Sequence, residues 1–401
     1  MLTTMNIDEL TTGDRTLFQK RTGIIDLGIG APDAPLLEHA RKALLAAANH
    51  HLSDPNHAVF VQYGPRAGDP VFRDALAKLL TSRLPGPAAA AEDLFTTAGA
   101  TSGLALAASC FFDTGAPVLI EDPTYFLARK VLKQAGMRLV PVAQDDDGIN
   151  PARLADAAQA LPPAPPGRRF RAMLYLIPTF NNPTGQVLPD RRRRDIIDIA
   201  RKNNLLVVCD DVYDLLSFND KPRPRRIVSM KGSEGWVLSN GSFSKILGPG
   251  MRCGWIESRG DLPEKLAQSA YARSGGGMNH FTTGILLSLI QSGAQARLLD
   301  RLRDTYRQRC NALCDALEES MPSAATFHRP DGGFFVWVTL PEGTDTLAAL
   351  DACQTQAGVR YQPGAWFGDA HSSLRLSFAH NHTADLQKGA HQLARFWASQ
   401  L

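Results

Sequence analysis

Short runs of hydrophobic residues alternate along the chain with longer segments in which hydrophobic residues recur every three or four positions. The short runs predict strands, and the periodic segments predict helices. The clearest helix patterns are Tyr125–Ala135 and Arg191–Asn203. The runs that predict strands are Pro117–Ile120, Arg138–Val142, Ala172–Ile177, Leu205–Cys209, Trp236–Leu238 and Cys253–Ile256.

Several of these runs are hydrophobic at every position, as in LLVVC and MLYLI. A strand with this pattern is buried on both faces, which is typical of a sheet covered by helices on both sides. The alternation of strands and helices therefore predicts an α/β fold, in which a three-layer α/β/α domain surrounds a mostly parallel sheet.

The pattern changes after about residue 295. A long amphipathic helix is predicted from Ala296 to about Ser320, and strands follow in GGFFVWVTL and SLRLSFA. This order indicates a separate, small α+β domain. We therefore expect an N-terminal segment (residues 1–45) that packs with the small domain, a large domain (46–295) and the small C-terminal domain (296–401).

The composition is that of an ordinary globular protein, with 44% hydrophobic and 21% charged residues in a chain of 401. The net charge of +3 is small and no basic stripe is interleaved with aromatic residues, so nucleic acid is not an expected partner. Arg191–Arg194 is the densest basic cluster, and we expect it to be a solvent-exposed helix face. No hydrophobic run approaches the roughly 20 residues of a membrane span, so a membrane is not an expected partner either.

The cysteines and histidines do not indicate a disulfide framework or a metal site. Six cysteines are few for this length, and Cys310 and Cys314 share the hydrophobic face of the long predicted helix, which favours buried thiols. The ten histidines lack the spacing of metal ligands. The first residues include Asp8, Glu9 and Asp14 and lack the hydrophobic core of a signal peptide, so we expect a cytoplasmic protein.

Candidate functional residues gather immediately after the predicted strands. In open α/β sheets, ligands bind outside the carboxyl ends of the strands, so these residues should share one crevice. Each has an ordinary structural explanation, such as a helix cap, a turn residue or a surface charge, but their joint placement favours a common site. They are Tyr125, Asn182, Asp210, Tyr213, Ser242, Ser244 and Lys245, with Gly99, Ala100 and Thr101 at a helix start whose backbone N–H groups can bind an anion.

This set of groups is what pyridoxal phosphate chemistry requires. A lysine amine forms a Schiff base with the cofactor aldehyde. A carboxylate keeps the pyridine nitrogen protonated, so that the ring can take up electrons from the substrate's α-carbon. A helix N-terminus, hydroxyl groups and an arginine suit the phosphate. We therefore predict this cofactor, with Lys245 at the aldehyde and with Ser242, Ser244 and Arg252 at the phosphate.

The chain resembles the fold-type-I pyridoxal phosphate enzymes of the class I/II aminotransferase family over nearly its whole length. DGGFFVWVTL and RSGGGMNHF are similar to the subgroup that contains α-aminoadipate and kynurenine aminotransferases. One departure is Ala100-Thr101-Ser102, which replaces a turn that commonly contains glutamine and leaves phosphate binding to the backbone. The motifs that carry the resemblance are YGPRAG (Tyr63–Gly68), GAT (Gly99–Thr101), EDPTY (Glu121–Tyr125), NNPTG (Asn181–Gly185), DDVY (Asp210–Tyr213), SFSKILGPGMRCGW (Ser242–Trp255) and LRLSF (Leu374–Phe378).

The resemblance implies a role for each residue around the cofactor ring. Tyr125 would stack on the ring, and Asn182 and Tyr213 would hydrogen-bond its 3-oxygen. Asp210 would pair with the ring nitrogen. Lys245 would first anchor the cofactor and then move a proton between the substrate's α-carbon and the cofactor's C4′.

The resemblance also implies how the substrate and a second subunit are bound. Arg375 would bind the substrate α-carboxylate, assisted by backbone near Gly30, although a lone arginine on a strand is more often a surface charge. Tyr63 would reach the phosphate of the neighbouring subunit, which implies a homodimer with shared sites. Asp211 is the alternative should Asp210 not be the carboxylate at the ring nitrogen.

We predict an aminotransferase that moves an amino group between an α-amino acid and a 2-oxo acid. The same cofactor could instead support a C–S lyase, a decarboxylase or an oxidase, because fold does not decide the reaction. Ser242 and Lys245 also fit the S-x-x-K motif of serine acyl-enzymes, but the accompanying S-D-N and K-T-G motifs do not occur in this sequence. A regulator of this family would carry a preceding DNA-binding domain, and the lead before IIDLGIGAPD is expected to be too short for one.

Overall fold

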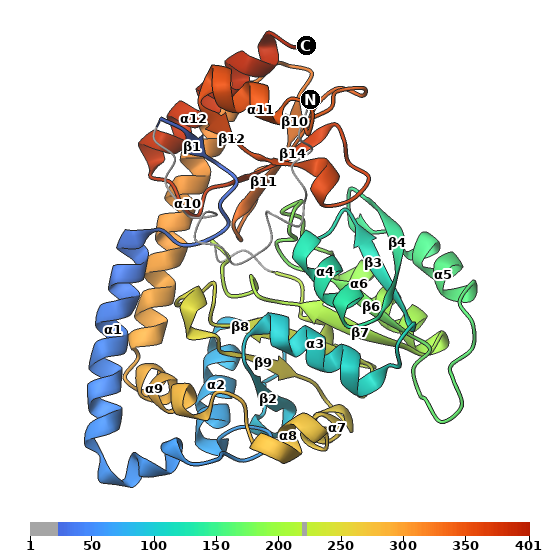
Figure 1. Ribbon diagram of the computed structural model, residues 1–401, viewed down its shortest axis with the longest axis vertical. Coiled ribbons are helices and arrows are strands. Elements are labelled where there is room, and N and C mark those ends of the chain that lie inside the picture. Colours follow the sequence, from blue (N-terminus) through green and yellow to red (C-terminus); the bar gives the residue numbers. More distant parts are fainter. Residues whose placement is uncertain (1–22, 219–222) are drawn as a thin grey trace.

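An eight-stranded sheet is the largest feature of the computed structural model, which describes residues 23–218 and 223–401 (Figure 1). Five central strands run parallel, whereas β9 is antiparallel to both of its neighbours and β5 is antiparallel to β4. In spatial order the strands are β2 (Leu94–Thr97), β9 (Gly254–Glu257), β8 (Val237–Ser242), β7 (Leu205–Asp210), β6 (Ala172–Leu176), β3 (Pro117–Asp122), β4 (Arg138–Asp145) and β5 (Gly148–Ile149). The prediction made from Asp8, Glu9 and Asp14 lies outside the described residues.

Helices cover both faces of this sheet, so the predicted three-layer α/β fold is confirmed. Alternate residues of each central strand face opposite hydrophobic clusters, because successive side chains of a strand point to opposite faces. One cluster joins the sheet to α3 (Ala100–Phe111), α4 (Phe126–Gln134) and α7 (Leu262–Ala267). The other joins it to α5 (Pro151–Gln159) and α6 (Asp190–Lys202).

The six predicted strands and the two predicted helices between them are confirmed to within a few residues. Two strands of the sheet were not predicted. Leu94–Thr97 is only four residues long, and Gly148–Ile149 is a two-residue pairing that closes a hairpin with β4. The first of these strands has hydrophobic residues only at Leu94 and Phe95, and the second only at Ile149, so neither forms a hydrophobic run that could be recognised.

A smaller sheet lies beside the large one and is formed by the C-terminal part of the chain. Its order is β10 (Thr326–Phe327), β11 (Phe335–Thr339), β14 (Ser373–Ser377) and β13 (Gln362–Pro363). Near it, the short strand β1 (Ile25–Asp26) pairs with β12 (Val359–Arg360), so an N-terminal segment packs with the C-terminal part. The predicted domain limits both fall within continuous helices: 45/46 lies in α1 (Ala34–Ser53) and 295/296 lies in α10 (Ala294–Ser320). The division into domains stays a prediction.

Helix α10 runs alongside α1, from α9 (His280–Gln291) to α12 (Thr383–Ala398) (Figure 1). Its hydrophobic face is buried, and it includes Cys310 and Cys314, whose sulfur atoms are 4.0 Å apart. The prediction of buried thiols is therefore confirmed. α10 is amphipathic, and no helix in the described part of the chain is long and hydrophobic enough to cross a membrane.

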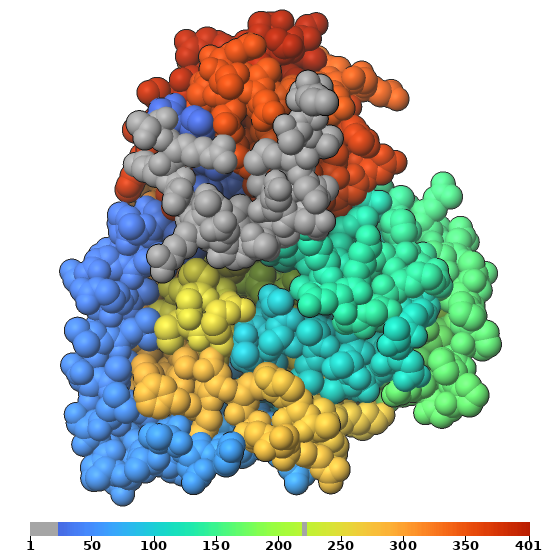
Figure 2. Space-filling model, in the orientation of Figure 1, coloured from blue at the N-terminus to red at the C-terminus, as the bar shows by residue number. Residues whose placement is uncertain are grey.

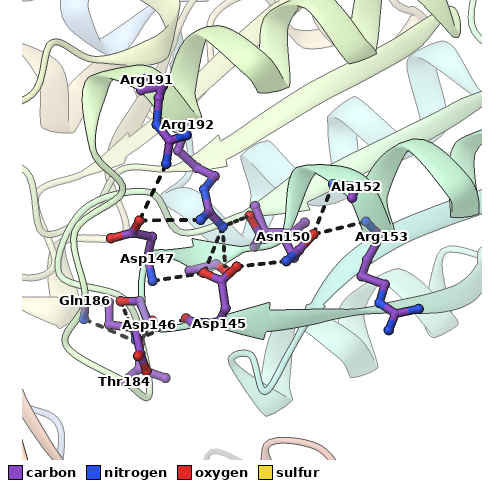
Figure 3. A network of polar contacts seen from close by, with 12 residues as sticks. Asp145, Asp146, Asp147, Asn150, Ala152, Arg153, Thr184, Gln186, Arg191 and Arg192 are labelled. Carbon is purple, nitrogen blue, oxygen red and sulfur yellow. Dashed lines mark hydrogen bonds and ion pairs between the residues drawn. The ribbon is translucent and has the colours of Figure 1, made fainter.

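The prediction that Arg191–Arg194 is a solvent-exposed face is wrong for its two central residues. Arg192 is 6% exposed, and its Nη1 donates to Asp145 Oδ1 at 2.9 Å in the β4–β5 hairpin, with Asp147 nearby (Figure 3). Arg193 is 0% exposed and donates to backbone carbonyl groups. Four consecutive residues of a helix cannot share one face, so the inner two are buried and the outer two remain exposed.

Candidate active site

Most of the predicted site residues, but not Tyr63, come together where the carboxyl ends of β6, β7 and β8 face the small sheet. The hydrogen bond between Arg375, on β14, and Asn182, after β6, joins the two sheets at this point. In the space-filling view, the surface is hollowed where the cyan and teal residues of α3 and α4 face the yellow residues around 245 (Figure 2). This is the crevice that parallel-sheet topology predicts.

Lys245 comes three residues after the end of β8, at this edge of the sheet. Its Nζ donates to the carbonyl oxygen of Gly30 at 3.2 Å and lies 5.4 Å from the centre of the Phe334 ring. Burial and the charge of Arg375 lower the pKa of Lys245 to about 8, against the opposing charge of Asp210. About a tenth of this amine is therefore neutral, and thus nucleophilic, at pH 7, a far larger fraction than for an ordinary lysine.

Asp210 is the last residue of β7 and is 8% exposed. Its Oδ2 accepts a hydrogen bond of 2.7 Å from the hydroxyl of Tyr175, and its Oδ1 is buried with no hydrogen-bond partner among the described residues. Burial raises the pKa of Asp210 to about 6, although the bond from Tyr175 and the charge of Lys245 oppose the rise. One carboxylate oxygen is thus held by the protein and the other is free to bind a cation.

Asp211, the alternative carboxylate, has other partners. Its Oδ2 accepts a hydrogen bond from the hydroxyl of Ser239, which lies on β8. Burial and the neighbouring charge of Asp214 raise its pKa well above the usual range. Only Asp210 of the two interacts with Lys245, which favours Asp210 as the carboxylate of the site.

Arg375 is held rigidly from several sides. Its Nη1 donates to Asn182 Oδ1 and its Nη2 to the carbonyl oxygen of Gly28, both at 2.8 Å. The guanidinium carbon lies 4.0 Å from the centre of the Phe335 ring and 4.9 Å from that of Phe367. Burial lowers the pKa of Arg375 to about 10, so the group stays charged at neutral pH and is not a surface charge.

Near Gly30, two groups of the site meet the same short segment. The Gly30 carbonyl accepts from Lys245, and a Cβ added at Gly30 would lie 2.8 Å from the Phe335 ring. We predicted that backbone near Gly30 assists Arg375. Gly30 does lie near the site, but the backbone carbonyl that Arg375 contacts is that of Gly28.

The predicted phosphate-binding groups lie around the start of α3. Gly99 is the N-cap residue with φ +91°, and no side chain caps this end of the helix. A Cβ at Gly99 would lie 3.0 Å from Arg252 Nη2, so only glycine lets the guanidinium approach the helix start. The Arg252 Nη1 lies 3.4 Å from Ser244 Oγ, which in turn is 2.9 Å from Ser242 Oγ. These groups form a cluster of hydrogen-bond donors with one positive charge.

Of the remaining predicted residues, Tyr125 and Tyr213 are covered by the protein and the others are more exposed. Tyr125 immediately precedes α4, and burial raises its pKa to about 12, with a further contribution from the charge of Asp210. Tyr213 is 3% exposed and lies near Asn182 and Lys245.

On the first turn of α3, Thr101 is exposed and Ala100 is half-buried. Tyr63, in contrast, lies on the surface after the 3₁₀ helix η2 (Pro55–Val61), is 79% exposed, and is not brought into the crevice by its own chain.

Two buried residues beneath the crevice were missed as site residues. Tyr175 is the only tyrosine in its otherwise aliphatic strand, which was a weak signal. Glu121 is 0% exposed, and burial raises its pKa to about 8 although it accepts hydrogen bonds from the Ile177 amide and the Asn181 side chain. Glu121 is therefore mostly neutral at neutral pH and holds the NNPTG loop in place.

Comparison with known proteins identifies the family. The family described as "Aminotransferase class I and II" matches residues 22–393. Aromatic-amino-acid aminotransferase 1 of Thermococcus litoralis is 31% identical over 371 residues, which cover 92% of this chain and 86% of that protein. An uncharacterized HTH-type transcriptional regulator of Escherichia coli, YjiR, is 29% identical over 382 residues, which cover 92% of this chain and 77% of that protein.

A solved structure agrees with these relatives. The α-aminoadipate aminotransferase LysN of Thermus thermophilus, complexed with N-(5'-phosphopyridoxyl)-L-leucine, matches with a TM-score of 0.81 and 27% identity, over 98% of this chain and 96% of that one. The chain belongs to the class I and II aminotransferases. It is a transaminase of fold type I, and its cofactor is pyridoxal phosphate.

The residues of the crevice fit this cofactor on three observations. The buried Asp210 Oδ1 lacks a hydrogen-bond partner in the described structure, as expected of an atom that a protonated ring nitrogen would contact. The Lys245 amine contacts only a carbonyl oxygen among hydrogen-bond acceptors that the structure describes. The uncapped start of α3, with Arg252 beside Gly99, suits a phosphate group.

The buried charge of Asp210 leads to a prediction for the cofactor-free protein. Its pKa of about 6 exceeds the ordinary 3.8, so the folded state binds the proton more tightly. The contribution of this carboxyl to stability is then present below the ordinary pKa and is lost as pH rises through about 6. Asp210→Asn should therefore stabilise the cofactor-free protein at about pH 8, by at most about 3 kcal/mol, and much less at about pH 4.5.

Thermal unfolding of the cofactor-free proteins at both pH values checks this. Glu319→Gln, which removes an exposed carboxylate from α10, is the matched control and should change stability little at either pH. If Asp210→Asn stabilised the protein as much at the low pH as at the high pH, this would contradict the inference that burial destabilises the ionised carboxyl of Asp210.

Proposed function

We propose that Lys245, Asp210 and Arg375 carry out transamination of α-amino acids in this crevice. The observation that supports this most directly is their arrangement around one buried point. The Lys245 amine is influenced by the charges of both Asp210 and Arg375, although the three residues come from β7, β14 and the segment after β8.

Lys245 and Asp210 are the groups that act on the cofactor in the proposed mechanism. When bound, pyridoxal phosphate supplies an aldehyde that bonds to amines and a protonated ring that accepts electrons from the substrate's α-carbon. Lys245 would hold the cofactor through its amine, and its neutral Nζ would be the base that moves a proton between the substrate's α-carbon and C4′. Asp210 Oδ1 would keep the proton on the ring nitrogen, since a carboxylate favours the charged form of a nearby base.

The other predicted residues bind and orient. Arg375 forms hydrogen bonds with the substrate α-carboxylate, and its contacts with Asn182 and Gly28 fix the guanidinium before the substrate arrives. Asn182 and Tyr213 would hydrogen-bond the 3-oxygen of the ring, with Tyr125 stacked on it. Gly99, Ala100 and Thr101 offer backbone N–H groups to the phosphate, together with Ser242, Ser244 and Arg252. Aromatic amino acids are the first donors to test, because rings of Phe335 and Phe367 flank Arg375.

The proposal includes a homodimer with shared sites. Large hydrophobic residues are exposed on α1, η2 and α2 (Pro70–Arg83) and on α9 (His280–Gln291), which packs against the other three. Such a surface is typical of a protein–protein interface. Tyr63 follows η2 at this surface, where it can reach a site in a second subunit. The exposed residues are Leu45, Leu52, Val59, Val61, Tyr63, Val71 and Phe281.

We also propose a cytoplasmic location. All six cysteines of the sequence are free thiols in the structure. Disulfides are rare in the reducing cytoplasm, so free thiols throughout fit that compartment. Cell fractionation with an antibody to the protein tests this, and recovery outside the cytoplasmic fraction would contradict it.

Transamination predicts a fixed stoichiometry. Protein that holds pyridoxal phosphate and receives only an amino donor should release about one 2-oxo acid per active site and then stop, because the amino group stays on the cofactor. The absorbance of the lysine-bound cofactor should fall as the pyridoxamine form appears. Addition of 2-oxoglutarate or pyruvate should restore that absorbance and restart the reaction.

The same measurement distinguishes the alternatives. A lyase, decarboxylase or oxidase needs no amino acceptor and would continue to turn over, releasing products such as ammonia or carbon dioxide. A regulator without activity would release no oxo acid with any donor. Sustained turnover without an oxo acid would refute the proposed mechanism, while the fold and the cofactor would remain.

Shared sites predict complementation between two defective chains. Lys245→Ala chains cannot attach the cofactor, and Tyr63→Phe chains should bind it weakly because the phosphate loses a hydrogen bond. In a mixed dimer, the site with an intact Lys245 receives an intact Tyr63 from the partner subunit. Mixing should therefore restore tight cofactor binding to a fraction of sites, measured by titration with pyridoxal phosphate. Mixing with chains that carry both substitutions is the control, and equal results in the two mixtures would contradict a shared site.

A further inference from the structure

The hydroxyl of Tyr175 is the only side-chain donor to Asp210 in the described part of the chain. Tyr175 lies at the centre of the large sheet, on β6, and is 0% exposed. In register it is paired with Val208 of β7 and with Ile120 of β3. Since Val208 and Asp210 point to the same face of β7, Tyr175 is the diagonal neighbour of Asp210 on that face.

This contact divides the two oxygen atoms of the carboxylate. Oδ2 accepts the hydroxyl at 2.7 Å, whereas Oδ1 is buried without a partner among the described residues. The charge of Lys245 also favours the ionised form of Asp210. The charge of Asp210 in turn raises the pKa values of Glu121 and Tyr125, so both groups lie near it. Because a buried carboxylate is stable only when donors compensate its desolvation, Tyr175 supports the charged form of Asp210.

We propose that Tyr175 is a positioning residue, which fixes Oδ2 of Asp210 so that Oδ1 holds the proton on the ring nitrogen of the bound cofactor. This inference rests on the proposed role of Asp210. Without the tyrosine hydroxyl, the carboxylate of Asp210 becomes a stronger base and competes with the ring nitrogen for the proton. The proton then moves from the ring nitrogen toward Asp210, and the ring withdraws fewer electrons from the substrate's α-carbon.

The test reads the ring nitrogen directly. Holoprotein is prepared with pyridoxal phosphate labelled with nitrogen-15 in the ring, and the chemical shift of that nitrogen reports whether it is protonated. Asp210→Asn, which can accept but carries no charge, supplies the reference shift for the neutral ring. Tyr175→Phe should move the shift from the wild-type value toward that reference. It should also slow exchange of the substrate α-proton by roughly tenfold, the effect of losing a hydrogen bond to a charged group.

Tyr361→Phe is the matched control. The Tyr361 hydroxyl is also buried and donates at 2.7 Å, but to the carbonyl oxygen of Thr346 near the small sheet. This variant loses a comparable buried hydrogen bond, so it should lose stability as Tyr175→Phe does while keeping the wild-type shift. A purely structural role of Tyr175 predicts that the two variants behave alike.

The outcomes separate the two proposals. A wild-type shift in Tyr175→Phe, together with a neutral-ring shift in Asp210→Asn, would overturn the role of Tyr175 and leave that of Asp210 intact. A wild-type shift in Asp210→Asn would instead refute the role of Asp210 itself. Should Tyr175→Phe fail to hold the cofactor, Tyr175→Gln is measured instead, because its side-chain amide retains a hydrogen-bond donor. Recovery of the protonated shift in that variant supports the proposal, and recovery of binding with a neutral ring contradicts it.

Discussion

The carboxylate of Asp210 is buried at the end of a central strand, and a buried carboxylate is stable only when donors or cations compensate for the lost water. The hydroxyl of Tyr175 compensates one oxygen, and the other has no partner in the described structure. Lys245 and Arg375 add positive charge nearby, but each is itself partly deprived of water, and burial lowers the pKa of both. The crevice thus holds charges that are incompletely balanced until a ligand with a cationic ring and anionic groups is bound.

The topology of the sheet explains how these groups meet. Parallel strands β6, β7 and β8 end at one edge, so the segments that follow them lie together although they are far apart in sequence. The small sheet contributes Arg375 from the opposite side, and the bond between Arg375 and Asn182 connects the two sheets at the point where the substrate would lie. One of the contacts between the two sheets therefore also fixes the proposed carboxylate-binding group.

Much of the fold could be predicted from the sequence, because the central strands are hydrophobic on both faces and the helices between them are strongly periodic. Lys245, Asp210 and Asn182 could be named as candidates since each follows a strand in the sequence. Arg375 came only from family resemblance, because its partners lie about 190 residues or more away in the chain and no local pattern connects them.

Other features depend on register and packing that local patterns do not contain. Tyr175 contacts Asp210 because β6 and β7 pair with Tyr175 beside Val208, and the sequence alone does not give that register. Arg192 and Arg193 look like surface charges in the sequence but are buried against a hairpin and a loop that complete their hydrogen bonds. The sequence likewise could not separate Asp210 from Asp211, whereas their different hydrogen-bond donors do so in the structure.

The role proposed for Lys245 is to carry the cofactor at the point where these buried charges meet. Borohydride reduction of the holoprotein, followed by proteolysis and mass spectrometry, identifies the lysine involved, because reduction makes the bond between the aldehyde and the amine permanent. We expect one labelled peptide, in which Lys245 bears the phosphopyridoxyl group. Label on another lysine, or none in protein saturated with pyridoxal phosphate, would contradict it.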